Sequence, residues 1–126
     1  MHPTDIARQA YEAFSTGDME TIGGLLASDT VWHINDVAPL NGDKTGVEGV
    51  FGFLGSLMEM TGGTFGIKVN EYLGNDTHAA MLIHESAERD GKTLSASAVH
   101  VMRIQNGKVA EFWASTADPA NTAFWS

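Results

Sequence analysis

His100 is one of five histidines in this chain. An imidazole is suited to proton transfer because it titrates near neutral pH. His100 lies between Ser95 and Ser115, a stretch that predicts two strands joined at Asn106-Gly107. Asn-Gly between apolar runs is typical of a type I′ hairpin turn, which needs positive φ at both central residues. A two-residue loop fixes the register, so His100 is expected to face Trp113.

Side chains alternate along a strand, so this register predicts what shares the face of His100. The face comprises Ala96, Ala98, His100, Met102, Glu111, Trp113 and Ser115. An imidazole beside an indole, small residues and a carboxylate is typical of a pocket wall. The alternatives are that Trp113 belongs to the core, and that Glu111 lies in water at the sheet edge rather than orienting His100.

The opposite face of the hairpin is also largely apolar, so something is expected to cover it. Its members are Ser95, Ser97, Val99, Val101, Ala110, Phe112 and Ala114. The chain has no spare helix for this purpose. We therefore expect a two-fold homodimer, with Val99, Val101 and Phe112 in the interface.

Three helices and one short strand are expected in the N-terminal half of the chain. Thr4 can cap the first, which runs to about Phe14, and Asp18 can cap the second. A short strand covers 30–34, a Pro- and Gly-containing loop covers 35–45, and a glycine-rich helix covers 46–60. The glycines of this third helix indicate either tight packing on a sheet or a mobile flap at a pocket mouth.

The apolar period changes to two after Gly62-Gly63. Strands are expected at 64–73, 78–89, 92–105 and 108–116, followed by a short helix that Asp118 caps. Helices followed by an antiparallel meander predict one α+β domain over residues 1–126, with the helices on one face of the sheet. In this meander Glu85 shares the face of Ala96 and Ala98 as a possible buried acid, and His84 lies on the other face.

Composition narrows the function. The chain has 126 residues, a formal net charge of −9 and no cysteine. Seven Lys and Arg residues form no basic stripe, so a nucleic-acid surface is not expected. No apolar run is long enough to span a membrane and no signal peptide is visible, so a cytoplasmic location is expected.

Three segments resemble a known superfamily. They are Tyr11-x-x-Phe14-x-x-Gly17-Asp18, then Asp29-Thr30-Val31-Trp32-His33, then Gly107-Lys108-Val109-Ala110-Glu111-Phe112-Trp113. The chain resembles the nuclear-transport-factor-two-like fold, in its SnoaL-like and ketosteroid-isomerase-like branch. The resemblance implies a cone-shaped curved antiparallel sheet, with N-terminal helices on its concave face and a deep apolar pocket. It indicates function only weakly, because the fold hosts enzymes and inert binding modules.

The same resemblance suggests where chemistry would lie. His33 occupies the position of the isomerase base and His100 that of its oxyanion-binding aspartate. The isomerase tyrosine aligns with Ala10, one position from Tyr11. Both isomerase carboxylates are thus histidines here, so steroid isomerase activity is not supported. The SnoaL-like cyclases have a histidine near His100, but their aspartate on the last strand has no counterpart here.

These arguments predict a small-molecule site that needs no cofactor and no metal. His33 and His100 form the expected acid–base pair, acting on a carbonyl-bearing or polycyclic ligand. The remaining pocket residues are expected to be Trp32, Phe51, Leu54, Met102, Glu111, Trp113 and Ser115. Two alternatives stay open: histidines satisfied by backbone or water, and a ligand-binding or dimerisation module without turnover.

Overall fold

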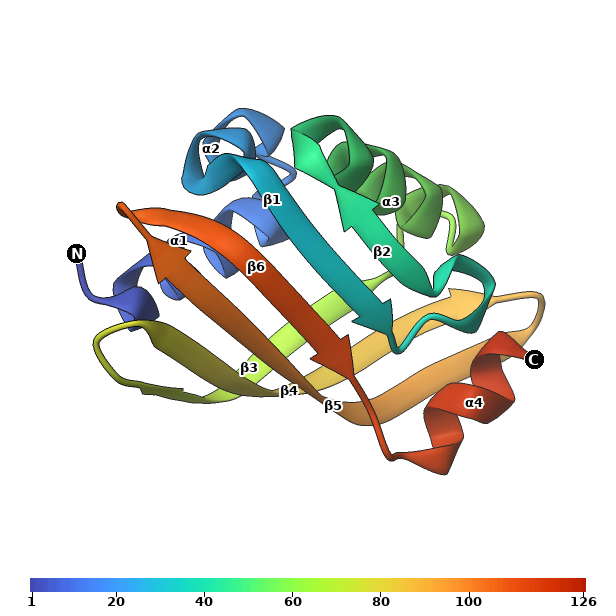
Figure 1. Cartoon of the computed structure of the whole chain (residues 1–126). Coiled ribbons are helices and arrows are strands. Elements are labelled where there is room, and N and C mark those ends of the chain that lie inside the picture. Colours follow the sequence, from blue (N-terminus) through green and yellow to red (C-terminus); the bar gives the residue numbers. More distant parts are fainter.

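The fold consists of one curved six-stranded sheet and four α-helices (Figure 1). A computed structural model describes all residues, 1–126. The elements are α1 (Pro3–Thr16), α2 (Met19–Leu25), β1 (Leu26–Asn35), η1 (Ala38–Leu40), β2 (Gly42–Thr45), α3 (Gly46–Met60), β3 (Gly66–Gly74), β4 (His78–Arg89), β5 (Lys92–Gln105), β6 (Lys108–Ser115) and α4 (Pro119–Trp125). The predicted α+β class, with a curved sheet and helices on its concave face, is confirmed.

The strand order β2-β1-β6-β5-β4-β3 adds two features that the sequence did not reveal. The sheet is mixed rather than purely antiparallel, because β1 and β6 run parallel. The expected loop over 35–45 contains a short edge strand, β2, which pairs antiparallel with β1. Strand β1 is also longer than expected and begins directly after α2.

The helices divide the concave face between them. Helix α1 packs on β3, β4 and β5, whereas α3 packs on β1 and β2, so the space between the two helices lies over the centre of the sheet (Figure 1). Helix α4 packs against β5 at one end. Asp18 and Asp118 cap α2 and α4 as predicted, while His2 rather than Thr4 caps α1. None of the helices has the length and apolar character that crossing a membrane requires.

The β5–β6 hairpin contains the predicted turn and an unpredicted bulge. Gln105 pairs with Lys108, and Asn106 and Gly107 have φ of 53° and 75°. Ile104 pairs with Val109 but Arg103 pairs with Glu111, which leaves Ala110 as an extra residue. One extra residue turns every later side chain of a strand to the other face. The predicted pairing of His100 with Trp113 is therefore wrong.

Candidate functional site

An apolar cavity of about 70 Å³ lies between the helices and the concave face of the sheet. Its wall comes from α1, α2, β1, α3, β3, β4, β5 and β6, so almost every element contributes. The half-exposed wall residues are Ala10, Tyr11, Phe14, Leu25 and Ile67. The cavity therefore approaches the surface beside α1, the end of α2 and β3.

Polar side chains gather in one part of this apolar wall. The hydroxyl of Tyr11 lies 2.6 Å from Nδ1 of His100, and the two rings stack at 5.9 Å between centroids. On the other side of the imidazole, Nε2 lies 3.6 Å from Oδ2 of Asp36. His100 is thus held between a phenol and a carboxylate, in the order that orients a general base.

A second buried acid, Glu85, completes the group. The amide nitrogen of Asn121 in α4 donates to Oε1 of Glu85 over 3.2 Å and to the backbone oxygen of Asp36 over 2.7 Å. Asp36, Glu85 and His100 offer donor atoms that all lie within 4.8 Å of one another. Their exposed fractions are only 3%, 1% and 4%, so water screens these groups little.

Burial and mutual contact separate the proton affinities of these groups. Burial, and after it the negative charge of Asp36, raises the pKa of Glu85 to about 9. Burial alone would raise the pKa of Asp36 as well, but the neighbouring imidazole of His100 and carboxyl group of Glu85 bring this pKa below its ordinary value. Burial also raises the pKa of Tyr11 well above its ordinary value. The pKa values of the two carboxyl groups are thus pushed apart, Glu85 upward and Asp36 downward.

Asp36, Glu85 and His100 could offer one donor atom each to a cation, fewer than the four or more ligands that a divalent ion takes. A metal there would have to displace the proton of Glu85, because carboxylate ligands bind deprotonated. The prediction that the site uses no metal stays a prediction.

Several residues predicted for the pocket do lie in the cavity wall. These are Trp32, Leu54, Met102 and His100. Phe51 does not; its ring is half-buried against Gly23 of α2. Glu111, Trp113 and Ser115 were predicted on the face of His100, but the bulge at Ala110 turns them to the convex face.

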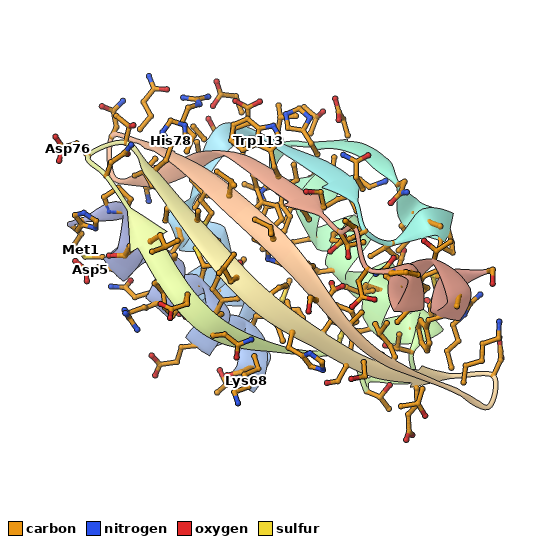
Figure 2. All side chains as sticks on the ribbon, turned by 90° about the horizontal axis from the view of Figure 1, so that it is seen from below. Met1, Asp5, Lys68, Asp76, His78 and Trp113 are labelled. Carbon is orange, nitrogen blue, oxygen red and sulfur yellow. The ribbon has the colours of Figure 1, made fainter.

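The predicted partnership of His33 with His100 is wrong, because the two side chains lie on opposite faces of the sheet. Nδ1 of His33 lies 2.8 Å from Asp43 of β2, and Nε2 lies 2.6 Å from Glu111 of β6. The hydrogen bond with Glu111, and after it that with Asp43, raises the pKa of His33. His33 also stacks on Trp113, and the ring of His78 lies on that indole too, at 6.4 Å between centroids (Figure 2).

Phe112 requires the opposite correction. It was expected in the outer, dimer-forming face, but it is buried in the cavity wall beside Trp32 and His100. Val99 stays on the convex face and Val101 pairs there with Trp113. The physical reason is again the shift at Ala110, which exchanges Phe112 and Trp113 between the two faces.

Sequence reasoning did not find Asp36, and it left Tyr11 one position from the site. Asp36 falls in the segment that was read as a loop. Had β1 been extended with Trp32 facing inward, the alternation through Ile34 would have placed Asp36 inward too. Tyr11 enters the cavity from α1, and its partner His100 lies 89 positions later, so no local pattern joins them.

Comparison with known proteins agrees with this architecture. The model of the SnoaL-like domain family matches residues 7–112, and the chain belongs to this family. No curated protein matches the chain. The described fold is the nuclear-transport-factor-two-like fold that the sequence resembles.

Solved structures show the same likeness over almost the whole chain. Bal32a, from a soil-derived mobile gene cassette, is 31% identical with a TM-score of 0.91, over 97% of this chain and 95% of Bal32a. A protein of unknown function with a cystatin-like fold from Xanthomonas campestris is 32% identical with a TM-score of 0.90, over 100% and 99%. TerC, co-crystallised with polyporic acid, is 20% identical with a TM-score of 0.86, over 98% of each chain.

Proposed function

We propose that this protein binds a hydrophobic, carbonyl-bearing ligand in the cavity and catalyses proton transfer next to the carbonyl without a cofactor. The observation that carries the proposal is the contact of Tyr11 with His100, at 2.6 Å, inside an otherwise apolar wall. An intact phenol can donate to a developing enolate oxygen, and an imidazole backed by a carboxylate can accept the proton. In this proposal His100 is still a catalytic residue but acts as the base, the position that the resemblance gave to His33. Tyr11 takes the oxyanion-binding position that the resemblance gave to His100.

The step begins when the ligand carbonyl takes the hydrogen bond that Tyr11 gives to His100. This exchange frees the lone pair on Nδ1, which removes the proton from the adjacent carbon. The C–H bond breaks and an N–H bond forms, while the C–H electron pair becomes the C=C bond of an enolate. The oxygen takes up the carbonyl π pair and accepts from Tyr11. Asp36 stabilises the imidazolium, which then returns its proton to carbon.

The family supports the ligand class in a general way. The chain belongs to the SnoaL-like domain family, and a putative polyketide cyclase from Streptomyces antibioticus, IdmH, has the same fold at 21% identity. TerC, which has the same fold at 20% identity, was co-crystallised with polyporic acid. Together with an apolar wall that carries one proton-transferring group, this favours an isomerase- or cyclase-type reaction on an organic carbonyl compound.

Solvent deuterium exchange tests the proposal without knowledge of the natural substrate. The bicyclic ketone 2-tetralone carries acidic protons beside its carbonyl, and its deuteration in D₂O is followed by NMR. We expect the protein to accelerate exchange, and Tyr11→Phe and His100→Gln each to lower the rate by about 100-fold. The control is Tyr72→Phe, which removes a neighbouring phenol that lies edge-on to Tyr11 and outside the hydrogen-bonded group.

The competing function is a binding module without turnover. The apolar wall supports it equally, because burial of a hydrophobic ligand needs no proton-transferring group. For either function the cavity of about 70 Å³ must widen to hold a ligand, since most ligand pockets have roughly 300–1,000 Å³. If the ketone shifts the NMR signals of Tyr11 and His100 but exchanges no faster than in buffer, the cavity binds without catalysing this step. The catalytic proposal would then be wrong.

We further propose that the convex face of the sheet forms a homodimer. Exposed apolar side chains of β3, β4 and β5 lie there, namely Leu73, Leu82 and Val99. Val101 and the ring of Trp113 continue the same surface. The ion pair of Arg103 with Glu111 lies next to them and supplies charges of both signs. A two-fold axis lets one such patch cover itself. The cytoplasmic location stays a prediction.

A further inference from the structure

Glu85 is a fully buried acid to which the proposed reaction assigns no step. It lies on β4, in the cavity wall, with an exposed fraction of 1%. Every titratable group that faces it belongs to the same site: Asp36 after β1, His100 on β5 and Tyr11 on α1. Helix α4 adds only the neutral amide of Asn121.

The carboxyl groups of Asp36 and Glu85 have oxygens within 4.8 Å of each other, and both groups are buried. Two such groups cannot both be ionised without a large electrostatic cost, so they share one proton. The neighbours decide which group holds it. Asp36 has an imidazole nitrogen at 3.6 Å, which favours a negative charge there. Glu85 has Asn121 and Asp36 as partners, and neither carries a positive charge.

From this arrangement we infer that Glu85 is a positioning residue: it remains a neutral acid and donates its proton to Asp36, which holds that carboxylate toward His100. The inference rests on the proposed function for its catalytic meaning and on the geometry for the placement of the proton. Since the amide of Asn121 donates to Oε1, the other oxygen of Glu85 is left to carry the proton to Asp36.

Helix α4 thereby becomes part of the site. One amide group of Asn121 fixes the side chain of Glu85 and the backbone of Asp36 at once. The buried rings of Phe124 and Trp125 hold the helix on the protein, and Asp118 caps its start. Helix α4 therefore holds Glu85 and Asp36 in place, and Asp36 in turn orients the imidazole of His100.

Three variants at β4 separate this role from that of an ionised base. Glu85→Gln keeps a neutral donor and an acceptor, so we expect 2-tetralone exchange to stay within about threefold of the wild-type rate. Glu85→Leu removes both and is expected to lose at least tenfold in kcat, with little change in KM. Glu88→Gln, on the exposed side of the same strand, is the matched control.

The pH profile adds a readout that a merely structural role would not change. The wild-type rate should fall as pH rises through about 9, where Glu85 loses its proton, and Glu85→Gln should lack this limb. A Glu85→Gln variant that folds but loses exchange at all pH values would overturn the inference, because the ionised carboxylate would then be the active form.

A direct measurement decides the protonation state even if no ketone is turned over. With ¹³C in the side-chain carboxyl of glutamate, one NMR signal should titrate near pH 9 in the wild type and be absent in Glu85→Gln. This result supports the inference about Glu85 when the exchange assay fails, in which case only the proposed function is wrong. A Glu85 signal that titrates below pH 6 would overturn the inference.

Discussion

At the scale of single residues, the site depends on separating the proton affinities of groups that touch one another. Tyr11 and Glu85 keep their protons because both are buried, whereas Asp36 loses its proton because it has His100 beside it. Groups with affinities pushed apart are the usual sign of divided acid and base roles. The proposed reaction uses the tautomer of His100 that carries its proton on Nε2 toward Asp36 and its lone pair on Nδ1.

The free energy of unfolding should depend on pH in a way that reveals whether Glu85 is protonated in the folded state. Between the unfolded pKa of 4.5 and the folded pKa of about 9, the folded state binds one more proton than the unfolded state. Stability from this group is therefore full below pH 4.5 and falls as pH rises, by at most about 1.4 kcal/mol per pH unit. Urea unfolding of wild type and Glu85→Gln from pH 5 to 9 should give curves that diverge, with the variant less dependent on pH. Parallel curves would show that Glu85 is ionised in the folded state.

His33 allows a second test of pH-dependent stability, at a residue that lies outside the cavity and has no role in the proposed reaction. Its raised pKa means that its contribution is full below about pH 6.5, the unfolded value, and lost as pH rises through the folded value. His33→Leu should therefore lower Tm by a few degrees at pH 6 and by less at pH 9, and leave ketone exchange intact. His84→Leu is the control, because its imidazole bonds a serine rather than two carboxylates. Loss of exchange in His33→Leu alone would place His33 in the reaction.

At the scale of elements, the sequence predicts strands and turns better than it predicts which face a residue occupies. The Asn106-Gly107 turn has a local cause, so its composition reveals it. The bulge at Ala110 has no such signature in the run Val109-Ala110-Glu111, yet it exchanges Phe112 and Trp113 between the faces. Strand β2 was missed for a related reason, since Gly42 and Asp43 are poor strand formers that pair only because β1 is adjacent.

Helix α3 offers a test of the flap that its glycines suggested. A Cβ at Gly52 or Gly55 would meet nothing within 4 Å, so close packing does not require glycine at either position. Gly52→Ala/Gly55→Ala should thus stabilise the protein by about 0.5–1 kcal/mol per site in urea unfolding. If α3 opens to admit ligand, the double variant should also bind 2-tetralone several-fold more slowly in stopped-flow mixing.

Gly46 is the matched control for this helix, because its φ of 73° strains any other residue. Gly46→Ala should lower stability, whereas the double variant raises it. A more stable double variant with an unchanged association rate would contradict the flap and leave α3 as a fixed cover.

At the scale of the whole molecule, one curved sheet separates the two proposed functions. Its concave face carries the buried group of Tyr11, Asp36, Glu85 and His100, and its convex face carries exposed apolar side chains between charged ones. The sequence predicted both a pocket face and an association face. The sequence assigned the β6 residues to the wrong faces. The face that a residue occupies depends on the register of the whole hairpin and not on local composition.

The convex face gives the last prediction. Val99 is 40% exposed on β5, between Leu82 and Ser115 of the neighbouring strands. A two-fold interface centred there would bring Val99 near its own copy, so Val99→Glu would place two carboxylates in an apolar contact and destabilise the dimer. Sedimentation should show a dimer for wild type and a monomer for Val99→Glu.

Because Val99 points away from the core, ketone exchange should persist in the monomer. Gln9→Glu adds the same charge on exposed α1 and should remain dimeric. A wild-type monomer, or a Val99→Glu dimer, would refute this interface.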